Sequence, residues 1–432
     1  MRIFDPLHGF IHFNAIEESL VNSICFQRLR YIHQLGMTYL VFPGATHKRF
    51  EHSIGSMALA SKIFDQLIYN ASHDLSQHLP NWKDPTVKNY FRQVLRLAAL
   101  CHDLGHLPFS HTAESVFLPQ HGHEKMTLRL IHSPQLLSMW NIQDTIGRDM
   151  AEDIAKVAIG EKLAQKYYPT SCVDEWQRLL SEIITSDYFG ADRIDYLLRD
   201  AYCTGVSYGK FDNLQLIDNL LLVEDPHSSR HLTIGIKEKA VHAAEDLLLS
   251  RYFMHSRVYQ HPKIKVYAFH LVQFMKKVFG ETSWEEHSVD QFLQSSDQDI
   301  LQKLWLATSD KTHIGHDEAC QILSKDRRYR YVPIPTAALQ ELTVRRMLQQ
   351  LKKEWNGDLS LESDFCCDKN IYDPPPLWYL AGNGQKFNLL DRSDLCHHII
   401  KKKPKCSYLF VKAEKENLLK NKLKDLEAVS NV

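Results

Sequence analysis

The chain has 432 residues, 44% of them hydrophobic, and a formal net charge of −1. This length and apolar content support a large core, whereas the balanced charge excludes the global positive field typical of nucleic-acid-binding proteins. The nine cysteines show no metal-type pair spacing and no stretch approaches the ~20 apolar residues of a membrane span, so we expect a soluble cytoplasmic protein with reduced thiols.

The first half of the chain is predicted to be mostly helical. Two prolines interrupt the pattern and predict a turn over 80–85. Apolar residues recur at helical spacing over 20–34, 54–69, 90–101, 150–158, 176–186 and 193–200.

The second half mixes helices and strands. Segments 220–224 and 231–236 predict a β-hairpin, and a long helix follows from about 240 to 258. We therefore expect a mainly α fold, a helical bundle with a small mixed α/β C-terminal lobe, divided into domains 1–275 and 276–432. The lobe is predicted to contain strands over 329–335 and 408–412, a loop over 373–376 and a charged tail, helical or disordered, over 413–432.

Residues 97–111, Leu-Ala-Ala-Leu-Cys-His-Asp-Leu-Gly-His-Leu-Pro-Phe-Ser-His, carry the most chemistry. An apolar helical stretch leads directly into His102 and Asp103, and His106 and His111 follow. Imidazole nitrogen and carboxylate oxygen together suit Fe, Mn, Zn or a similar divalent ion. The alternative, a helix end with polar caps, is disfavoured because so many polar groups on a buried helix need partners.

Two further segments complete a candidate metal set. His52 opens an amphipathic pattern, and Asp192, Tyr196 and Asp200 recur every four residues along one helix face. The four candidate ligands, His52, His102, Asp103 and Asp192, would then come from three helices that converge in a bundle core. Such a set leaves coordination positions open for water and a phosphate oxygen, which indicates a metal-dependent hydrolase.

The order His, His-Asp, Asp resembles that of the HD-domain phosphohydrolases. Over roughly residues 1–275, the chain resembles one branch of this family more closely, the deoxynucleoside triphosphate (dNTP) triphosphohydrolases. This resemblance implies an HD-domain core, an Fe, Mn, Zn or Mg ion, and hydrolysis of dNTPs to deoxynucleoside and tripolyphosphate. The stretches that carry it are Asp5–Gly9, Phe26–Gly36, Val41–Ser53 and Arg257–His261.

The resemblance also assigns proton-transfer roles. It makes His111 the residue that transfers a proton at the α-phosphate and Glu114 its partner; a carboxylate three residues away can orient the imidazole and raise its basicity. His106 is expected to contact the α-phosphate and His123 to take part in catalysis. For His123 an ordinary solvated loop histidine remains the alternative.

Substrate selectivity is likewise implied by the resemblance. Gln34 and Leu35 would contact the deoxyribose, and Tyr196 and Asp200 the region around its 3′-hydroxyl, where a buried carboxylate penalises substrates that lack the group. A surface stripe engaged in ordinary ion pairs is the alternative for the basic residues. The triphosphate would be bound by Arg49, Arg193, Arg251, His255 and Tyr259.

A candidate allosteric nucleotide site comprises Asn22, Gln27 and Arg30, by the same resemblance. An amide at position 22 cannot present two acceptors to guanine, so we expect a homo-oligomer, a dimer or tetramer, that does not require GTP. Gln27 and Arg30 are equally compatible with ordinary contacts between helices.

Two other functions remain open at this point. One is an HD-domain phosphohydrolase for a monophosphate or cyclic diester, which would not need the cations Arg49, Arg193 and Arg251. The other is a nucleotide-sensing protein without turnover, which would not need a complete set of metal ligands. No membrane or nucleic-acid partner is indicated.

Overall fold

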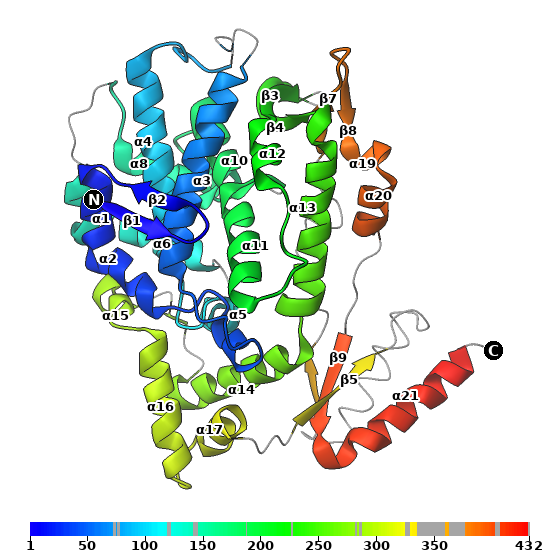
Figure 1. Ribbon diagram of the computed structural model, residues 1–432. Helices are drawn as coiled ribbons and strands as arrows, with labels where there is room; N and C mark the ends of the chain where they lie inside the picture. The colour runs from blue at the N-terminus through cyan, green and yellow to red at the C-terminus, as the bar shows by residue number, and fades with distance from the viewer. Residues whose placement is uncertain are drawn as a thin grey trace. The chain divides into compact units, whose positions relative to one another are not determined.

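The chain divides into two compact units in the computed structural model (Figure 1). The first comprises Met1–Tyr252, Thr282–Asp299 and Pro374–Ile399, and the second comprises Phe253–Glu281, Ile300–Asp373 and Ile400–Val432. The domain boundary expected after residue 275 stays a prediction. The structure describes residues 1–71, 75, 78–118, 122–140, 146–186, 188–225, 228–280, 283–284, 287–324, 329–334, 359–362, 376–401 and 407–430.

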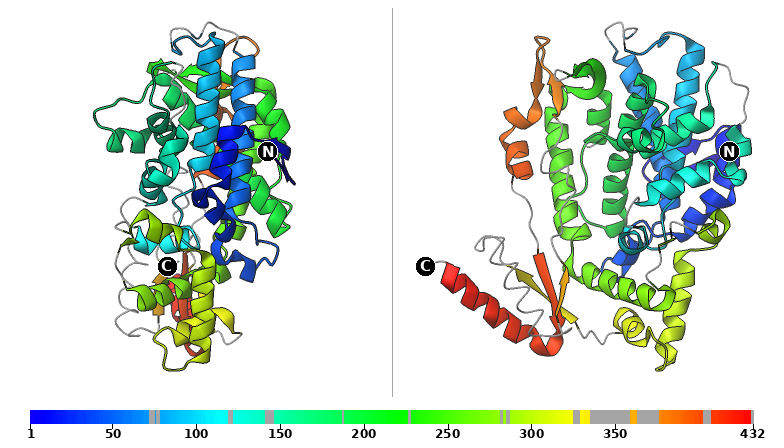
Figure 2. Two further views of the ribbon diagram at one scale, coloured as in Figure 1. Left: turned by 90° about the vertical axis from the view of Figure 1, so that its left-hand side faces the viewer. Right: turned by 180° about the vertical axis from the view of Figure 1, so that it is seen from behind.

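The first unit is built around α3 (Arg49–Tyr69), which packs against both α4 (Pro85–Cys101) and α11 (Ala191–Thr204), as Figures 1 and 2 show. Most of α3 is buried, so it forms the central helix of this bundle. The other helices that lie wholly or largely in this unit are α1 (Ala15–Asn22), α2 (Ile24–Gln27), α5 (His111–Phe117), α6 (Gly122–Ile131), α7 (Pro134–Trp140), α8 (Met150–Ile159), α9 (Glu161–Tyr167), α10 (Glu175–Thr185), α12 (Asn213–Asp218), α13 (Val241–Met254), α15 (Val289–Leu293), α19 (Leu389–Arg392) and α20 (Asp394–Lys401).

Helix α4 shows how the sequence brings polar residues into the interior. Asp84 caps its first turn by accepting a hydrogen bond from the Thr86 amide, and Pro85 occupies the first helical position, which tolerates proline. The last five residues, 97–101, are all fully buried. Because α4 ends inside the core, the residues that follow it, His102 and Asp103, are buried as well.

Two small sheets complete the first unit. Strands β1 (Arg2–Asp5) and β2 (Gly9–His12) form an antiparallel hairpin. The second sheet has the order β3-β4-β7-β8, and its β4 and β7 strands pair in parallel although the chain between them is long. Its strands are β3 (Leu220–Asp225), β4 (Ser228–Lys237), β7 (Trp378–Leu380) and β8 (Lys386–Asn388).

The second unit combines helices with a three-stranded antiparallel sheet in the order β5-β9-β6. Helix α14 packs on both α17 and β5, and α21 covers β5. Its elements are a π-helical turn η5 (His255–Tyr259), α14 (Pro262–Phe279), most of α16 (Asp297–Ser309), α17 (His316–Leu323), β5 (Tyr329–Ile334), β6 (Leu359–Glu362), β9 (Ser407–Lys412) and α21 (Glu416–Ser430).

The mainly α fold, the hairpin and the strands near 329 and 408 confirm the sequence-based expectations. The continuous helix expected over 20–34 is wrong, because Ser23 both ends α1 and caps α2, and a 3-10 turn, η1 (Arg28–Tyr31), follows. The tail forms α21 rather than remaining disordered. Residues 373–375 of the expected loop lie outside the described part of the chain.

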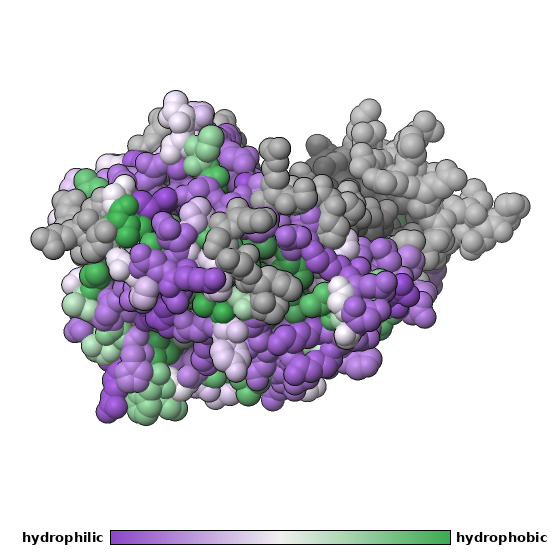
Figure 3. All heavy atoms as spheres, turned by 90° about the horizontal axis from the view of Figure 1, so that it is seen from above, coloured by the Kyte–Doolittle hydropathy of each residue, from purple (hydrophilic) through white to green (hydrophobic). Residues whose placement is uncertain are grey.

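The face of the molecule drawn in Figure 3 is predominantly polar. Figure 3 shows hydrophilic side chains over most of one face, with apolar ones scattered among them. Within the described ranges, no helix has both the length and the apolar character that crossing a bilayer demands.

Candidate metal centre and active site

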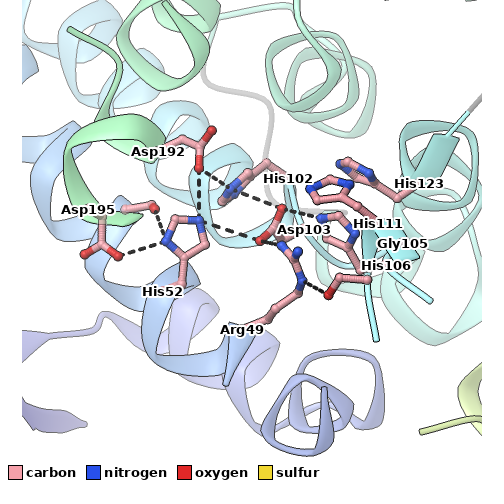
Figure 4. A network of polar contacts seen from close by, with 12 residues as sticks. Arg49, His52, His102, Asp103, Gly105, His106, His111, His123, Asp192 and Asp195 are labelled. Atoms are coloured by element: carbon pink, nitrogen blue, oxygen red, sulfur yellow. Dashed lines mark hydrogen bonds and ion pairs between the residues drawn. The ribbon is translucent and has the colours of Figure 1, made fainter. Parts of the chain in front are cut away.

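The four predicted metal ligands come together in the first unit (Figure 4). His52 lies in the first turn of α3, His102 caps the C-terminus of α4, Asp103 follows it, and Asp192 lies in the first turn of α11. The His52 Nε2 atom is 3.0 Å from Asp192 Oδ1 and 3.6 Å from Asp103 Oδ2. The His102 Nε2 atom is 3.4 Å from Asp103 Oδ1 and 3.7 Å from Asp192 Oδ1.

Hydrogen bonds on the far side of each imidazole orient it toward the centre. The Nδ1 atom of His102 lies 2.7 Å from the Ala99 carbonyl oxygen, which can only accept, so Nδ1 carries the proton. Its Nε2 atom is buried and has no hydrogen-bond partner among the described residues. The His52 Nδ1 atom donates in the same way to Asp195 Oδ2 at 2.8 Å. Both inward nitrogens are therefore oriented as metal ligands.

Electrostatics keep the two carboxylates ionised. Burial alone would raise the pKa of Asp103, but the adjacent Arg49 and His102 lower it well below its usual range. Burial also opposes ionisation of Asp192, yet the adjacent imidazoles of His102 and His52 lower its pKa. Burial lowers the pKa of His52, but Asp192 and Asp195 outweigh it and raise that pKa to about 10. Two ionised carboxylates thus face a protonated His52 and Arg49, and binding of a divalent cation would displace the His52 proton.

This donor set fits the metal expected from the sequence. Donor atoms of His52, His102 and Asp103 lie within 4.8 Å of one another, and Asp192 contacts both imidazoles. Two imidazole nitrogens favour Fe, Mn or Zn over Mg, which prefers oxygen ligands.

A second cluster adjoins the first through His106. This ring is 1% exposed, with Nε2 3.1 Å from Asp103 Oδ1 and Nδ1 in close contact with Glu114 Oε1. The other oxygen of Glu114 lies 3.0 Å from His111 Nδ1 and 3.3 Å from His123 Nδ1. Glu114 therefore connects three imidazoles, and the His111 side chain, 73% exposed, is the one that faces solvent.

The three imidazoles of this cluster do not share one protonation state. Burial and Arg49 lower the pKa of His106 to about 4, although Glu114 opposes the shift. Burial lowers the pKa of His123 as well, but Glu114 raises it to about 9. Burial raises the pKa of Glu114 itself, and His106 and His111 outweigh this and lower it well below its usual range. At neutral pH a neutral His106 and a protonated His123 thus share an ionised Glu114.

A strained turn joins the two clusters. Phe109 and Ser110 have φ angles of 57° and 55°, which cost non-glycine residues on the order of ~1–3 kcal/mol each. The guanidinium of Arg49 bridges the turn and the centre, because NH1 donates to Asp103 Oδ2 at 2.6 Å and Nε to Ser110 Oγ at 2.7 Å. Helix α5 begins directly after the turn, at His111.

The expected sugar-binding residues are partly engaged with other side chains. Asp200 is buried and lies 2.8 Å from the Nε2 atom of His47, a residue that sequence reasoning missed. Gln34 and Leu35 are half-buried, and the buried Oε1 atom of Gln34 has no hydrogen-bond partner among the described residues. Tyr196 is half-buried on α11.

The expected triphosphate-binding residues are divided between the two units. Arg193 donates to the Ser186 carbonyl oxygen at 2.8 Å, and Arg251 is 7% exposed in the first unit. His255 and Tyr259 belong to the second unit, where their rings make a T-shaped contact in the π-helical turn. Arg49 therefore lies at the candidate metal centre, whereas His255 and Tyr259 belong to the other unit.

The candidate allosteric residues form a local surface network. Gln27 donates to the Val21 carbonyl oxygen, and Arg30 donates to Gln27 Oε1 at 2.9 Å while lying over the Phe50 ring. Asn22 is exposed at the end of α1. These contacts account for the positions of Gln27 and Arg30 without a ligand.

Sequence reasoning also missed the residues that surround His52. Asp195 is fully buried; Arg199 binds both of its oxygens, at 2.8 and 2.9 Å, and His8 Nε2 lies 2.7 Å from Oδ1. Arg199 also donates to Asp5 Oδ2, which connects the β1-β2 hairpin to α11. The signal was present in the Asp5–Gly9 stretch and in the four-residue spacing of Asp195 and Arg199.

Comparison with known families matches two regions of the chain. The HD domain matches residues 49–196, and the HD-associated region matches residues 211–322. The first range includes His52, His102, Asp103 and Asp192, and the second begins shortly after α11.

Similar proteins come from distant organisms. An uncharacterised protein of Bacillus subtilis, YwfO, is 36% identical over 60% of this chain and 51% of its own. The deoxynucleoside triphosphate triphosphohydrolase SAMHD1 of Gallus gallus is 33% identical over 60% of this chain and 43% of its own. The alignments thus span about half the length of these curated relatives.

Two solved structures are similar along nearly the whole chain. A hypothetical protein from Aquifex aeolicus is 28% identical, with a TM-score of 0.74, and the match covers 98% of this chain and 99% of that one. A phosphohydrolase from Bacteroides thetaiotaomicron is 21% identical, with a TM-score of 0.72, over 95% and 99% of the two chains. The second likeness concerns the fold.

Proposed function

This chain is an HD-domain protein, and from that premise we propose that it is a metal-dependent hydrolase that converts dNTPs to deoxynucleoside and tripolyphosphate. The observation that carries the proposal is the pairing of a His/Asp centre with a second cluster of three histidines and Glu114, connected through His106 and Asp103. The SAMHD1 relatives, whose name states this activity, support the choice of substrate.

We assign His52, His102, Asp103 and Asp192 to the metal. When bound there, a divalent ion would polarise a phosphate oxygen and lower the pKa of a water molecule. Hydrogen bonds from Nδ1 to Asp195 and to the Ala99 carbonyl oxygen fix the two rings with their Nε2 atoms facing the centre. Arg49, already bound to Asp103, adds fixed positive charge beside the position of the phosphate.

Proton transfer is assigned to the second cluster. Glu114 holds the His111 ring through Nδ1, so Nε2 of this exposed imidazole is available to a substrate oxygen. His123, kept protonated by Glu114, contributes a second positive charge next to it. His106 lies between Glu114 and Asp103 and contacts both carboxylates, one with each ring nitrogen.

The test is a substrate panel. Purified protein is incubated with each dNTP, each NTP, deoxynucleoside monophosphates and cyclic dinucleotides, with Mn²⁺ or Mg²⁺, and the products are separated by anion-exchange chromatography. We expect tripolyphosphate and deoxynucleoside from dNTPs. Turnover of monophosphates or cyclic diesters alone would replace this proposal with another HD-type phosphohydrolase activity, and no turnover at all would favour a nucleotide sensor.

A further inference from the structure

A segment of the HD-associated region contacts the strained turn between Asp103 and His111. Arg28, 3% exposed, donates through Nε to the Ser295 carbonyl oxygen at 2.7 Å and through NH1 to the His106 carbonyl oxygen at 2.9 Å. Its guanidinium also lies over the Phe292 ring, 4.1 Å from the centroid. One end of the turn is thus fixed to residues 292–295.

Asp297 fixes the other end. Its Oδ1 atom accepts a hydrogen bond from the Phe109 amide at 2.7 Å. Its Oδ2 atom accepts from the His33 amide at 2.7 Å and lies 2.6 Å from His33 Nδ1. The carbonyl oxygen of His33 in turn accepts from Ser110 Oγ at 3.1 Å. The Asp297 carboxylate is 1% exposed, so it is shielded from water while it accepts hydrogen bonds from the backbone amides of Phe109 and His33.

Backbone hydrogen bonds shape the turn locally: the Ser110 amide donates to the Leu107 carbonyl oxygen at 2.8 Å and the His106 amide to the Asp103 carbonyl oxygen at 3.3 Å. Ser110 makes no side-chain capping bond to α5, and both left-handed residues carry a β-carbon. Such a conformation persists only where the surroundings determine it. Contacts that reach the turn from distant segments include those of Arg28, Arg49, His33 and Asp297. Among these four residues, Asp297 is the one that accepts a hydrogen bond from the backbone amide of a left-handed residue, Phe109.

We propose that Asp297 is a positioning residue, which holds the turn over residues 106–110 so that His111 and Glu114 stay aligned with the metal centre. The proposal rests on the function proposed above and adds a role for the HD-associated region in the active site. Asp297 touches no reacting atom; it acts through Phe109 and His33.

The experiment compares Asp297→Asn and Asp297→Ala with Asp299→Asn. The control removes the same charge two residues away, at an exposed side chain whose hydrogen bonds within the described part of the chain come from Ser296, just before the same helix. Asparagine keeps one acceptor oxygen, whereas alanine keeps none. Steady-state dNTP hydrolysis, metal content and hydrogen exchange of a peptide covering residues 104–118 are measured for all three variants.

We expect kcat to fall roughly 10-fold in Asp297→Asn and roughly 10²-fold in Asp297→Ala, with KM and metal content within about 2-fold, because misalignment affects the reacting geometry. Exchange of residues 104–118 should accelerate, while that of a peptide from α3 should not. Asp299→Asn should match the parent in every measurement.

Two outcomes would overturn the inference: unchanged exchange in residues 104–118, or faster exchange with unchanged kcat. The exchange measurement does not depend on the substrate. If dNTPs are not hydrolysed by the parent protein, the proposed function fails, while the positioning of the turn by Asp297 is still decided by hydrogen exchange.

Discussion

Each carboxylate of the candidate centre serves more than one partner. Asp103 contacts His52, His102, His106 and Arg49 at once. Asp192, 28% exposed, forms ion pairs with two of the described residues, His52 and His102. Replacing Asp103 would therefore disturb the Arg49 contact and the His106 cluster as well as the metal. Asp192 is the cleaner position at which to test metal binding.

Asp192→Ala is expected to lose most of the bound metal and nearly all hydrolysis, because one of four ligands is removed. Metal content of the purified protein is measured by mass spectrometry. Asp65→Ala serves as the control, since Asp65 is an exposed carboxylate on α3 that pairs with Arg92. Full metal content in Asp192→Ala would show that the ion lies elsewhere.

His111→Ala is expected to keep the metal and dNTP affinity but to lower kcat by roughly 10²-fold or more, because a proton-transfer group is lost. A steady-state comparison with His242→Ala provides the control; His242 is an exposed histidine that also has a glutamate three residues further on. Parental turnover in His111→Ala would move the proton-transfer role to another residue, with His123 the first to examine.

The buried pair of His47 and Asp200 predicts a pH-dependent stability. Burial lowers the pKa of His47, but the hydrogen bond to Asp200 outweighs it and raises the pKa to about 9. Because the folded-state pKa is raised, the pair stabilises the fold fully below about pH 6.5, and this contribution disappears as the pH rises through 9. Its size is about 3 kcal/mol.

Urea unfolding at pH 6 and at pH 9.5 measures this contribution. The parent protein should lose more free energy of unfolding between the two values than His47→Gln, which keeps a hydrogen-bond donor but does not titrate. An equal pH dependence in the two proteins would mean that His47 is not protonated in the folded state.

The sequence indicated which residues lie at the candidate metal centre, but it did not indicate which other residues contact and orient them. Four-residue spacing placed Asp192 and Asp200 on one helix face, and the apolar run before His102 indicated a buried helix end. The support of His52 by Asp195 spans 143 positions, and the contact of Asp297 with Phe109 spans 188. Local periodicity can place Asp195 and Arg199 on one helix face, but it carries no information about which distant residue each side chain contacts.

At the level of elements, capping residues explain the main errors. Ser23 accepts a hydrogen bond from the Phe26 amide and donates one to the Leu20 carbonyl oxygen, so it ends one helix and starts another within a continuous apolar pattern. Pro85, taken as part of a turn, starts α4 instead. Apolar spacing located most helices, but it does not determine where they begin and end.

The packing of α3 on α11 depends on Gly55. A β-carbon at this position would lie 2.1 Å from Asp195 Oδ1 and 2.3 Å from an Arg199 nitrogen, both of which are held in the buried network behind His52. Gly55→Ala should therefore lower the free energy of unfolding by roughly 1–3 kcal/mol, although alanine favours helix formation.

Chemical denaturation and metal content test this expectation, with Lys62→Ala, an exposed position on the same helix, as the control. Metal affinity should fall together with stability, because Asp195 orients His52. If Gly55→Ala were more stable than the parent, the two helices would have to move apart without any loss of stability, and the close packing at Gly55 would not be needed.

At the level of the whole molecule, we predict a homo-oligomer whose activity does not require GTP. Asn22 offers one amide oxygen where a guanine-specific site needs two acceptors, and Gln27 and Arg30 already bond to each other. Hydrolysis of dATP or dTTP is measured with and without GTP, alongside sedimentation velocity to determine the oligomeric state. Strict dependence on GTP, unaffected by Asn22→Asp, would contradict this interpretation.

The first compact unit is assembled from three separate stretches of the chain. During synthesis, all four proposed metal ligands are present in the chain once Asp192 has been added, but Asp297 and strand β7, which pairs with β4, are added much later. The first unit therefore cannot complete its contacts, including the pairing of β4 with β7, until residue 380 has been synthesised. A protein truncated after residue 275 would contain every proposed metal ligand but would lack these contacts.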